Sequence, residues 1–280
     1  MAPTAEIAGF WGTPTSTVDF CEPNYAVSHF VAEFWNAVTS IPIALVGLSG
    51  MVLSRRQQLG AEQFSCYAVV CIVGLGSIAF HATLMRTGQV LDEVPMLWVS
   101  LTLIYGACQH VRDRRFRRKV AVPSARRLAL LGAGLAAYAL IATSLYFSSG
   151  FETFVVMYGL SIALIVVLAA TILFTERPAV GPGPKRLLAT AACTYAGGFV
   201  LLWIPGEVLC HRVPLMQRLP MHAIFHLTSA AGPHLGLTAF ALFRFDDEPK
   251  TRVAPSLAFA GLPTIRRDGL LGAGHKLRVA

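Results

Sequence analysis

Residues 154–174 read FVVMYGLSIALIVVLAATILF, a run of 21 residues without a charged side chain. A helix needs about 20 apolar residues to cross the hydrocarbon core of a membrane. The run lacks the alternation of apolar and polar residues that is typical of a membrane barrel strand. Because backbone polar groups must be satisfied inside the segment when it lies in lipid, this stretch predicts a membrane-spanning helix.

The composition extends this prediction to the whole chain. Of its 280 residues, 55% are hydrophobic and 14% are charged, whereas a soluble domain carries about 25% charged residues. Such a composition excludes a disordered chain, a coiled coil and a disulfide-stapled miniprotein. Together with the opening run, the apolar stretches long enough to span the membrane are 34–53, 64–84, 94–111, 128–147, 154–174, 187–206 and 221–243.

We therefore expect an all-α, polytopic membrane protein, a seven-transmembrane helix bundle over 34–245. A segment of 1–33 precedes the bundle, and a tail of 246–280 with little periodicity, expected to be flexible, follows it. The first 30 residues lack the basic start and the apolar stretch of a signal peptide.

The basic residues give the expected bundle an orientation. Twenty of the 23 Lys and Arg residues fall on one side of the predicted membrane and three on the other. Cytoplasmic loops carry the excess of basic residues, so the N-terminus is expected outside, in a lumen or periplasm, and the tail in the cytosol. Topology thus accounts for the net charge of +8. Contact with anionic lipid remains an alternative use of the basic loops, and we expect no nucleic-acid partner.

Ionisable residues in membrane spans are costly and therefore point to function. Ser77 and His81 are four residues apart near the end of the second span, and His222 and His226 have the same spacing in the seventh. This spacing places each pair on one helix face. The topology puts His81 and His222 near the outer membrane face, with His226 one turn deeper and Asp92 at the start of the third span.

Three histidines suit a zinc ion, because three nitrogen ligands leave a fourth position for water. Bound zinc lowers the pKa of that water to about 7 and polarises a carbonyl group, and a carboxylate such as Asp92 can take and return the proton. The alternative is that each histidine caps a helix or bonds to a loop. For His234, deeper in the seventh span, we expect only a packing hydrogen bond.

The N-terminal segment carries acidic residues and no basic partner within residues 1–33. Asp19, Glu22, Asn24 and Glu33 supply hard oxygen ligands, and a calcium ion would relieve the repulsion between the carboxylates. The other interpretation is a solvated acidic segment.

Cysteine placement follows from the same topology. Cys21 and Cys210 lie in outer segments, where an oxidising compartment permits a disulfide between them. The other four cysteines fall within spans or near the cytosolic face and are expected to be buried free thiols.

Three stretches carry a resemblance to a known family: GFWGTPTSTVDFCEPNYAVSHFVAEFWN (9–36), GLGSIAFHATLMRTGQVLDEVPM (74–96) and HAIFHL (222–227). They resemble the signature regions of the alkaline ceramidases, seven-span intramembrane hydrolases related to the adiponectin-type receptors. The resemblance covers residues 9 to 245 in the family's order and spacing.

The resemblance implies roles for particular positions. His81, His222 and His226 resemble the zinc ligands, Asp92 the proton-transfer carboxylate and Ser77 the hydroxyl beside the metal. The implied calcium ligands are Asp19, the carbonyl of Phe20, Glu22, Asn24 and Glu33. Cys21 and Cys210 resemble the family's disulfide. The chain departs from the family at Phe20, where Trp is usual, and at Glu207, where Asp is expected.

What the resemblance implies about activity is zinc-dependent hydrolysis of ceramide to a fatty acid and a sphingoid base, with calcium in a supporting role. The alternatives are a related hydrolase of another lipid amide or ester, and a receptor-like protein with structural zinc; a transporter is the weakest. No obligate protein partner is expected. The expected location is the endoplasmic reticulum or Golgi membrane in a eukaryote, or the plasma membrane in a bacterium.

Overall fold

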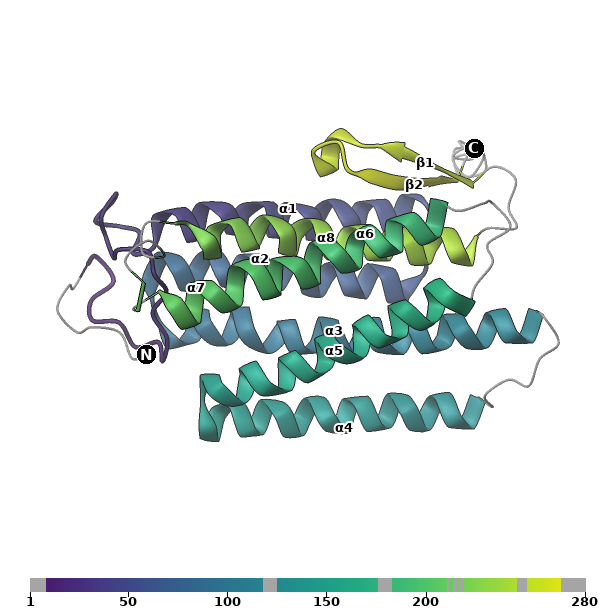
Figure 1. Ribbon diagram of the computed structural model, residues 1–280, viewed down its shortest axis with the longest axis horizontal. Coiled ribbons are helices and arrows are strands. Elements are labelled where there is room, and N and C mark those ends of the chain that lie inside the picture. The colour runs from purple at the N-terminus through teal and green to yellow at the C-terminus, as the bar shows by residue number, and fades with distance from the viewer. Residues whose placement is uncertain are drawn as a thin grey trace, which may run out of the picture.

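The computed structural model describes residues 9–117, 125–175, 183–210, 212–213, 216, 219–245 and 251–267. Helices lie side by side along the long axis of the molecule, and the N-terminal segment lies at the same end as α7 (Figure 1). The helical elements are α1 (Phe34–Arg56), α2 (Ala61–Thr83), α3 (Arg86–Arg117), α4 (Ala125–Ser149), α5 (Phe151–Thr175), α6 (Gly183–Gly198), the π-helix η1 (Phe199–Trp203), α7 (Ile204–Leu209) and α8 (Met221–Arg244).

Six of the helical segments are long and apolar enough to cross a membrane: α1, α2, the Arg86–Cys108 part of α3, the Arg126–Ser149 part of α4, α5, and Gly183–Leu209, which joins α6, η1 and α7. Large apolar side chains such as Leu140, Leu160 and Phe174 are exposed on α4 and α5. Apolar helices with apolar outer surfaces indicate a membrane protein.

The seventh predicted span forms α8, but α8 is not among the helices that are apolar enough by composition. Three histidines, at 222, 226 and 234, lower its mean hydropathy, and all three side chains are buried in the bundle. Since most of α8 faces protein, it does not need the uniformly apolar sequence of a lipid-facing helix. Its predicted helical character is confirmed, whereas a seven-span topology stays a prediction.

The third helix begins earlier than expected. Our span prediction started at residue 94, but α3 starts at Arg86, directly after the left-handed residue Leu84 that ends α2. This short turn sets α2 and α3 antiparallel and close together. Gly76 lies at their contact, where a Cβ atom would come within 2.2 Å of the Leu91 carbonyl oxygen. Asp92 therefore lies inside a helix that packs tightly against α2, rather than at a helix start.

The chain outside the bundle is held at both ends. At the end that carries the N-terminal segment, the backbone N–H groups of Thr15 and Ser16 donate to the carbonyl of Leu84, at 3.1 and 3.0 Å. At the opposite end, strands β1 (Thr251–Pro255) and β2 (Pro263–Arg267) form an antiparallel hairpin beside α1, joined by the 3₁₀-helix η3 (Leu257–Phe259) (Figure 1). We expected 246–280 to be a flexible tail, but residues 251–267 form this hairpin, because Phe259 and Ile265 bury apolar side chains.

Candidate metal centre

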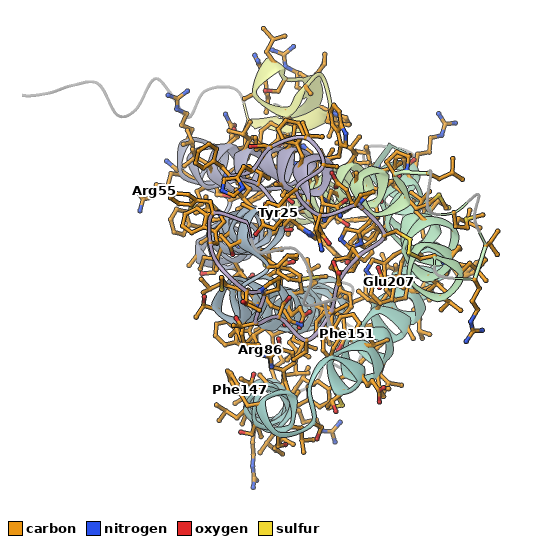
Figure 2. The ribbon with its side chains drawn as sticks, turned by 90° about the vertical axis from the view of Figure 1, so that its left-hand side faces the viewer. Tyr25, Arg55, Arg86, Phe147, Phe151 and Glu207 are labelled. Carbon is orange, nitrogen blue, oxygen red and sulfur yellow. A yellow bond between two sulfur atoms is a disulfide. The ribbon has the colours of Figure 1, made fainter. Side chains whose placement is uncertain are left out.

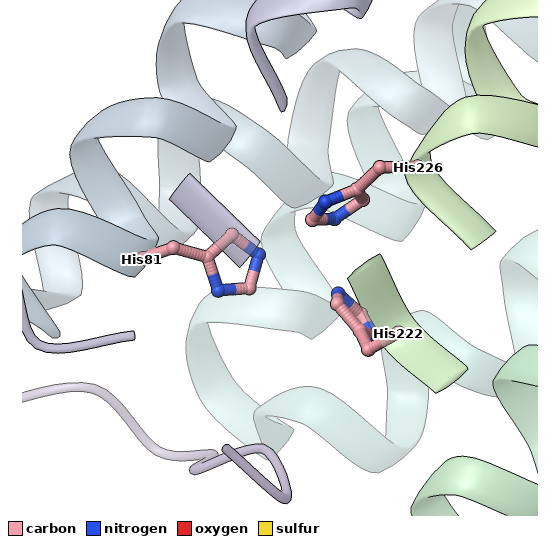
Figure 3. Close-up of side chains that lie close together, drawn as sticks. All are labelled: His81, His222 and His226. Carbon is pink, nitrogen blue, oxygen red and sulfur yellow. The ribbon is translucent and has the colours of Figure 1, made fainter. Parts of the chain in front are cut away.

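Three histidines meet at the end of the bundle that carries the N-terminal segment, where α2 ends and α8 begins. The ring centroids of His81, His222 and His226 lie 4.6 to 5.1 Å apart. One ring nitrogen of each lies within 4.8 Å of the other two, and this is the only such group of His, Cys, Asp or Glu in the described part of the chain. The rings face a common space (Figure 3). The predicted convergence of these side chains is therefore present.

The N-terminal segment fixes the orientation of His81. The backbone N–H of Glu33 donates to the carbonyl of His81 at 2.8 Å, which anchors the segment to the end of α2. The Glu33 side chain contacts Nδ1 of His81 through Oε2 and accepts a hydrogen bond from the Phe20 N–H at 2.9 Å through Oε1. A carboxylate that contacts the ring nitrogen not used for the metal is the usual way to orient a metal-binding histidine.

The other ring nitrogen of His81, Nε2, is buried and has no hydrogen-bond partner among the described residues. A buried polar atom without a partner carries a desolvation cost of about 1–3 kcal/mol. Ligation of a metal ion would satisfy this atom, so the residues present fit a metal ion held by three histidines.

The other two histidines, His222 and His226, also have oxygen atoms near Nδ1 of the ring. Nδ1 of His226 lies 3.0 Å from the hydroxyl of Thr39 and 3.3 Å from that of Ser40. Nδ1 of His222 lies 3.7 Å from Oε1 of Glu207, just beyond hydrogen-bond distance. Each ring thus has one nitrogen beside an oxygen and one available to the shared space.

Ser77 and Asp92 lie next to the histidines. The hydroxyl of Ser40 donates to that of Ser77 at 2.9 Å, and Ser77 and Asp92 line the same cavity as His222 and His226. Both side chains are buried, with exposed fractions of 1% and 8%. The close α2–α3 contact at Gly76 brings these two groups together, so a carboxylate and a hydroxyl stand beside the histidine site as the sequence predicts.

These groups line a cavity between α2, α3, α5, η1 and α8. Its polar wall is formed mainly by Ser77, Asp92, Glu93, His222 and His226. The rest is aromatic and aliphatic: among the lining side chains are Phe20, Phe151, Phe154, Tyr158, Phe199, Trp203 and Phe225. A second, largely apolar cavity lies between α3, α5, α6 and α8 and shares Val99, Tyr158, Tyr195 and Pro233 with the first. A lining with one polar wall and otherwise apolar side chains suits a molecule with one polar group and long hydrocarbon chains.

The π-helix η1 shapes one wall of the cavity. Pro205 follows η1 and has no backbone N–H with which to continue the α-helical ladder. The local widening to a π turn presents Phe199 and Trp203, whose rings stack at 5.0 Å, towards the cavity. Single π turns of this kind occur frequently at functional sites.

The predicted calcium ligands are brought together in part. Nδ2 of Asn24 lies 3.2 Å from both carboxylate oxygens of Asp19, and Oδ1 of Asn24 is buried without a partner among the described residues. An unsatisfied amide oxygen beside carboxylates fits a hard cation.

Glu22 has a different environment from the other predicted calcium ligands. Its carboxylate accepts hydrogen bonds from the N–H groups of Trp35 and Asn36, at 2.7 and 2.9 Å, and so caps the start of α1. Burial raises the pKa of this carboxyl above its usual value, against the opposing effect of the two N–H donors. The calcium site stays a prediction, with Glu22 already occupied on its helix-facing side.

Two predictions about other residues are confirmed. Cys21 and Cys210 form a disulfide, with their Cα atoms 5.7 Å apart, which ties the N-terminal segment to the end of α7. His234 makes packing hydrogen bonds: Nδ1 lies 3.0 Å from the Tyr67 hydroxyl and Nε2 3.1 Å from the carbonyl of Pro263 in β2.

Two acidic residues at this site have no role in the prediction from the sequence. Glu93 directly follows Asp92 within α3, and neither its spacing nor the family resemblance distinguishes it. Glu207 was noted only as a departure from a family pattern, and its position beside His222 depends on how α7 packs. Glu207 lies in α7, at the end of the bundle that carries the N-terminal segment (Figure 1), and Figure 2 labels its side chain in the view along the helices from that end.

The fold and the site define a helical membrane protein with a buried three-histidine cluster that could hold a metal ion. A carboxylate and a largely apolar cavity lie beside this cluster. The family model for Ceramidase matches residues 12–265, and the chain belongs to this family. It is 31% identical over 253 residues to alkaline ceramidase 3 of Mus musculus, covering 87% of this chain and 89% of the relative. It is also 31% identical to alkaline ceramidase of Arabidopsis thaliana, with 79% and 81% coverage, and 24% identical to alkaline ceramidase YPC1 of Saccharomyces cerevisiae, with 82% and 77% coverage.

Proposed function

We propose that this protein hydrolyses the amide bond of ceramide inside the membrane, with a zinc ion held by His81, His222 and His226. The observation that carries the proposal is the buried histidine cluster beside Asp92 in a largely apolar cavity. Family membership and three curated alkaline ceramidases of similar length support this reaction over a receptor function.

The roles of the residues follow from their positions. Zinc, when bound, polarises the amide carbonyl and makes a water molecule more acidic. Asp92 accepts a proton from the attacking water and later returns it to the amine nitrogen as the C–N bond breaks. Ser77 lies in the same cavity as Asp92 and offers its hydroxyl to the oxyanion that forms on the carbonyl oxygen. The products are a fatty acid and a sphingoid base.

Calcium has a supporting place in the proposal. Asp19, the carbonyl of Phe20, Glu22, Asn24 and Glu33 would hold it at the outer end of the bundle. Because Glu33 also contacts His81, a cation there would stiffen the segment that orients this histidine. We further propose a seven-span topology with the N-terminus outside the cytosol, in an endoplasmic reticulum or Golgi membrane, or in a bacterial plasma membrane.

The test is ceramide hydrolysis by purified protein, with zinc measured in the same preparation. We expect activity that a strong chelator removes and zinc restores, and loss of bound zinc in His222→Ala. Asp92→Asn should retain zinc but lose about 100-fold or more in rate, because general acid–base catalysis contributes 10²–10⁴-fold. The exposed His29→Ala is the matched control for a histidine outside the site.

Two results would contradict the proposal. One is a zinc-loaded wild-type protein that cleaves N-acyl ethanolamines or phospholipids but not ceramide. The other is a His222→Ala variant that keeps both its zinc and its ceramide hydrolysis.

A further inference from the structure

Glu93 is a carboxylate in the same cavity that the proposed mechanism does not use. It follows Asp92 in α3, lines the cavity beside the histidines and is 3% exposed. Its Oε1 accepts a hydrogen bond from Nε2 of Gln89 at 3.0 Å. Its Oε2 is buried and has no hydrogen-bond partner within the described ranges.

A network at the outer end of the bundle fixes this carboxylate. Oε1 of Gln89 accepts from the N–H of Thr17 and from Arg86, each at 2.9 Å. Arg86 also donates to the Tyr146 hydroxyl at 2.8 Å. Arg86 is the first residue of α3, and Figure 2 labels its side chain in the view along the helices from this end. The Glu93 side chain is thus held through Oε1, which accepts from Gln89. Its Oε2 remains an acceptor without a donor among the described residues, in a cavity that is otherwise largely apolar.

A buried acceptor of this kind requires a donor. In a ceramide the two hydroxyl-bearing carbons of the sphingoid base are bonded directly to the carbon that carries the amide nitrogen. Asp92, which acts on that nitrogen, is the chain neighbour of Glu93, and both line the cavity. The aromatic and aliphatic walls can accommodate hydrocarbon chains but offer few acceptors for hydroxyl groups.

We propose that Glu93 binds the headgroup hydroxyls of the sphingoid base and selects hydroxylated amides over plain ones. This inference rests on the proposed function, since it names the part of the substrate that Glu93 recognises. A hydrogen bond to a charged group contributes about 1.5–3 kcal/mol, which corresponds to roughly 10–100-fold in kcat/KM.

The test compares two substrates with identical chains: a ceramide, and an N-acyl alkylamine that lacks both hydroxyls. We expect Glu93→Gln to lower kcat/KM for the ceramide by about 10–100-fold and to leave that for the hydroxyl-free amide unchanged. Glu152→Gln is the matched control, because Glu152 is exposed at the start of α5 and does not line the cavity. Zinc content should be equal in all three proteins.

Binding to an inactive background separates this inference from the proposed reaction. Asp92→Asn should bind the ceramide more tightly than the hydroxyl-free amide, and adding Glu93→Gln should remove that preference. Equal losses for both substrates, or no loss for either, would overturn the role of Glu93. If the wild-type protein cleaved neither substrate, the proposed function would fail, but the binding comparison would still decide what Glu93 recognises.

Discussion

At the scale of single residues, Glu207 controls how firmly His222 is oriented. Its Oε1 lies 3.7 Å from Nδ1 of His222, and that nitrogen has no hydrogen-bond partner in the described part of the chain. Loss of an oxygen that orients a metal-binding histidine costs 10–100-fold in metal affinity. Because this contact is longer than a hydrogen bond, we expect Glu207→Gln to weaken zinc binding by about 10-fold, measured by competition with a chelator.

The control for that prediction is again Glu152→Gln, which should bind zinc like the wild-type protein. Thermal unfolding of the zinc-free proteins should be similar for both variants, since Glu207 acts through His222 in the loaded protein. Unchanged zinc affinity in Glu207→Gln would mean that His222 is oriented by packing alone.

The residue scale also shows what could be predicted from the sequence. The histidine cluster was predictable because the i, i+4 spacing and the direction of each span fix which ends meet. The contact between Glu33 and His81 was not, because it depends on Leu84 adopting a left-handed conformation and accepting hydrogen bonds from residues 15 and 16. Glu93 was not predicted, because its position next to Asp92 in the sequence does not show that its side chain also lines the cavity.

At the scale of elements, the α2–α3 contact sets the distance between Ser77 and Asp92. Gly76→Ala would place a Cβ atom 2.2 Å from the Leu91 carbonyl oxygen, so α3 must move away. A misplacement of about 1 Å in a catalytic site can cost 10²-fold in rate, and overpacking costs about 1–3 kcal/mol in stability. We expect kcat for ceramide to fall by about 100-fold, with a lower midpoint of thermal unfolding.

Gly106→Ala is the matched control for the α2–α3 prediction. Gly106 also lies on α3, but no atom stands within 4 Å of the position of its Cβ. Its activity and unfolding should match those of the wild-type protein. A fully active Gly76→Ala would show that the two helices can separate without disturbing the site.

A second prediction at this scale concerns the deeper cavity between α3, α5, α6 and α8. Ala196 lines it, and Ala196→Phe would fill part of the space that a hydrocarbon chain would occupy. Each methylene excluded from an apolar pocket is worth about 0.8 kcal/mol. We expect the ratio of kcat/KM for short-acyl over long-acyl ceramides to rise by about 10-fold or more.

Ala137→Phe, on the exposed face of α4, should leave this acyl-chain ratio unchanged. A shift in preference for the length of the sphingoid base, rather than of the acyl chain, would assign the deeper cavity to the other chain. The extent of this cavity could not be predicted, because it depends on packing between four helices rather than on the pattern within one.

At the scale of the whole molecule, the helical bundle was predictable because each expected span matches a helix to within a few residues, apart from the start of α3. Hydropathy alone does not show that α8 packs largely against other helices. A helix surrounded by other helices can carry three histidines, and its composition then resembles that of a soluble core helix. The number of membrane crossings therefore rests on how the bundle packs and on the charge of its loops.

Orientation is the prediction that belongs to the whole molecule. Twenty basic residues on one side against three on the other place the N-terminal segment, the Cys21–Cys210 disulfide and the histidine site on the side away from the cytosol. Single cysteines at exposed positions test this: Ser148→Cys lies near the α4–α5 turn, and Ala61→Cys near the α1–α2 turn. In intact cells or sealed vesicles of known sidedness, a membrane-impermeant maleimide should label only Ser148→Cys from the non-cytosolic side. Labelling of Ala61→Cys from that side would contradict the predicted orientation and place the histidine site at the cytosolic face. The wild-type protein, labelled in parallel, gives the background from its native thiols.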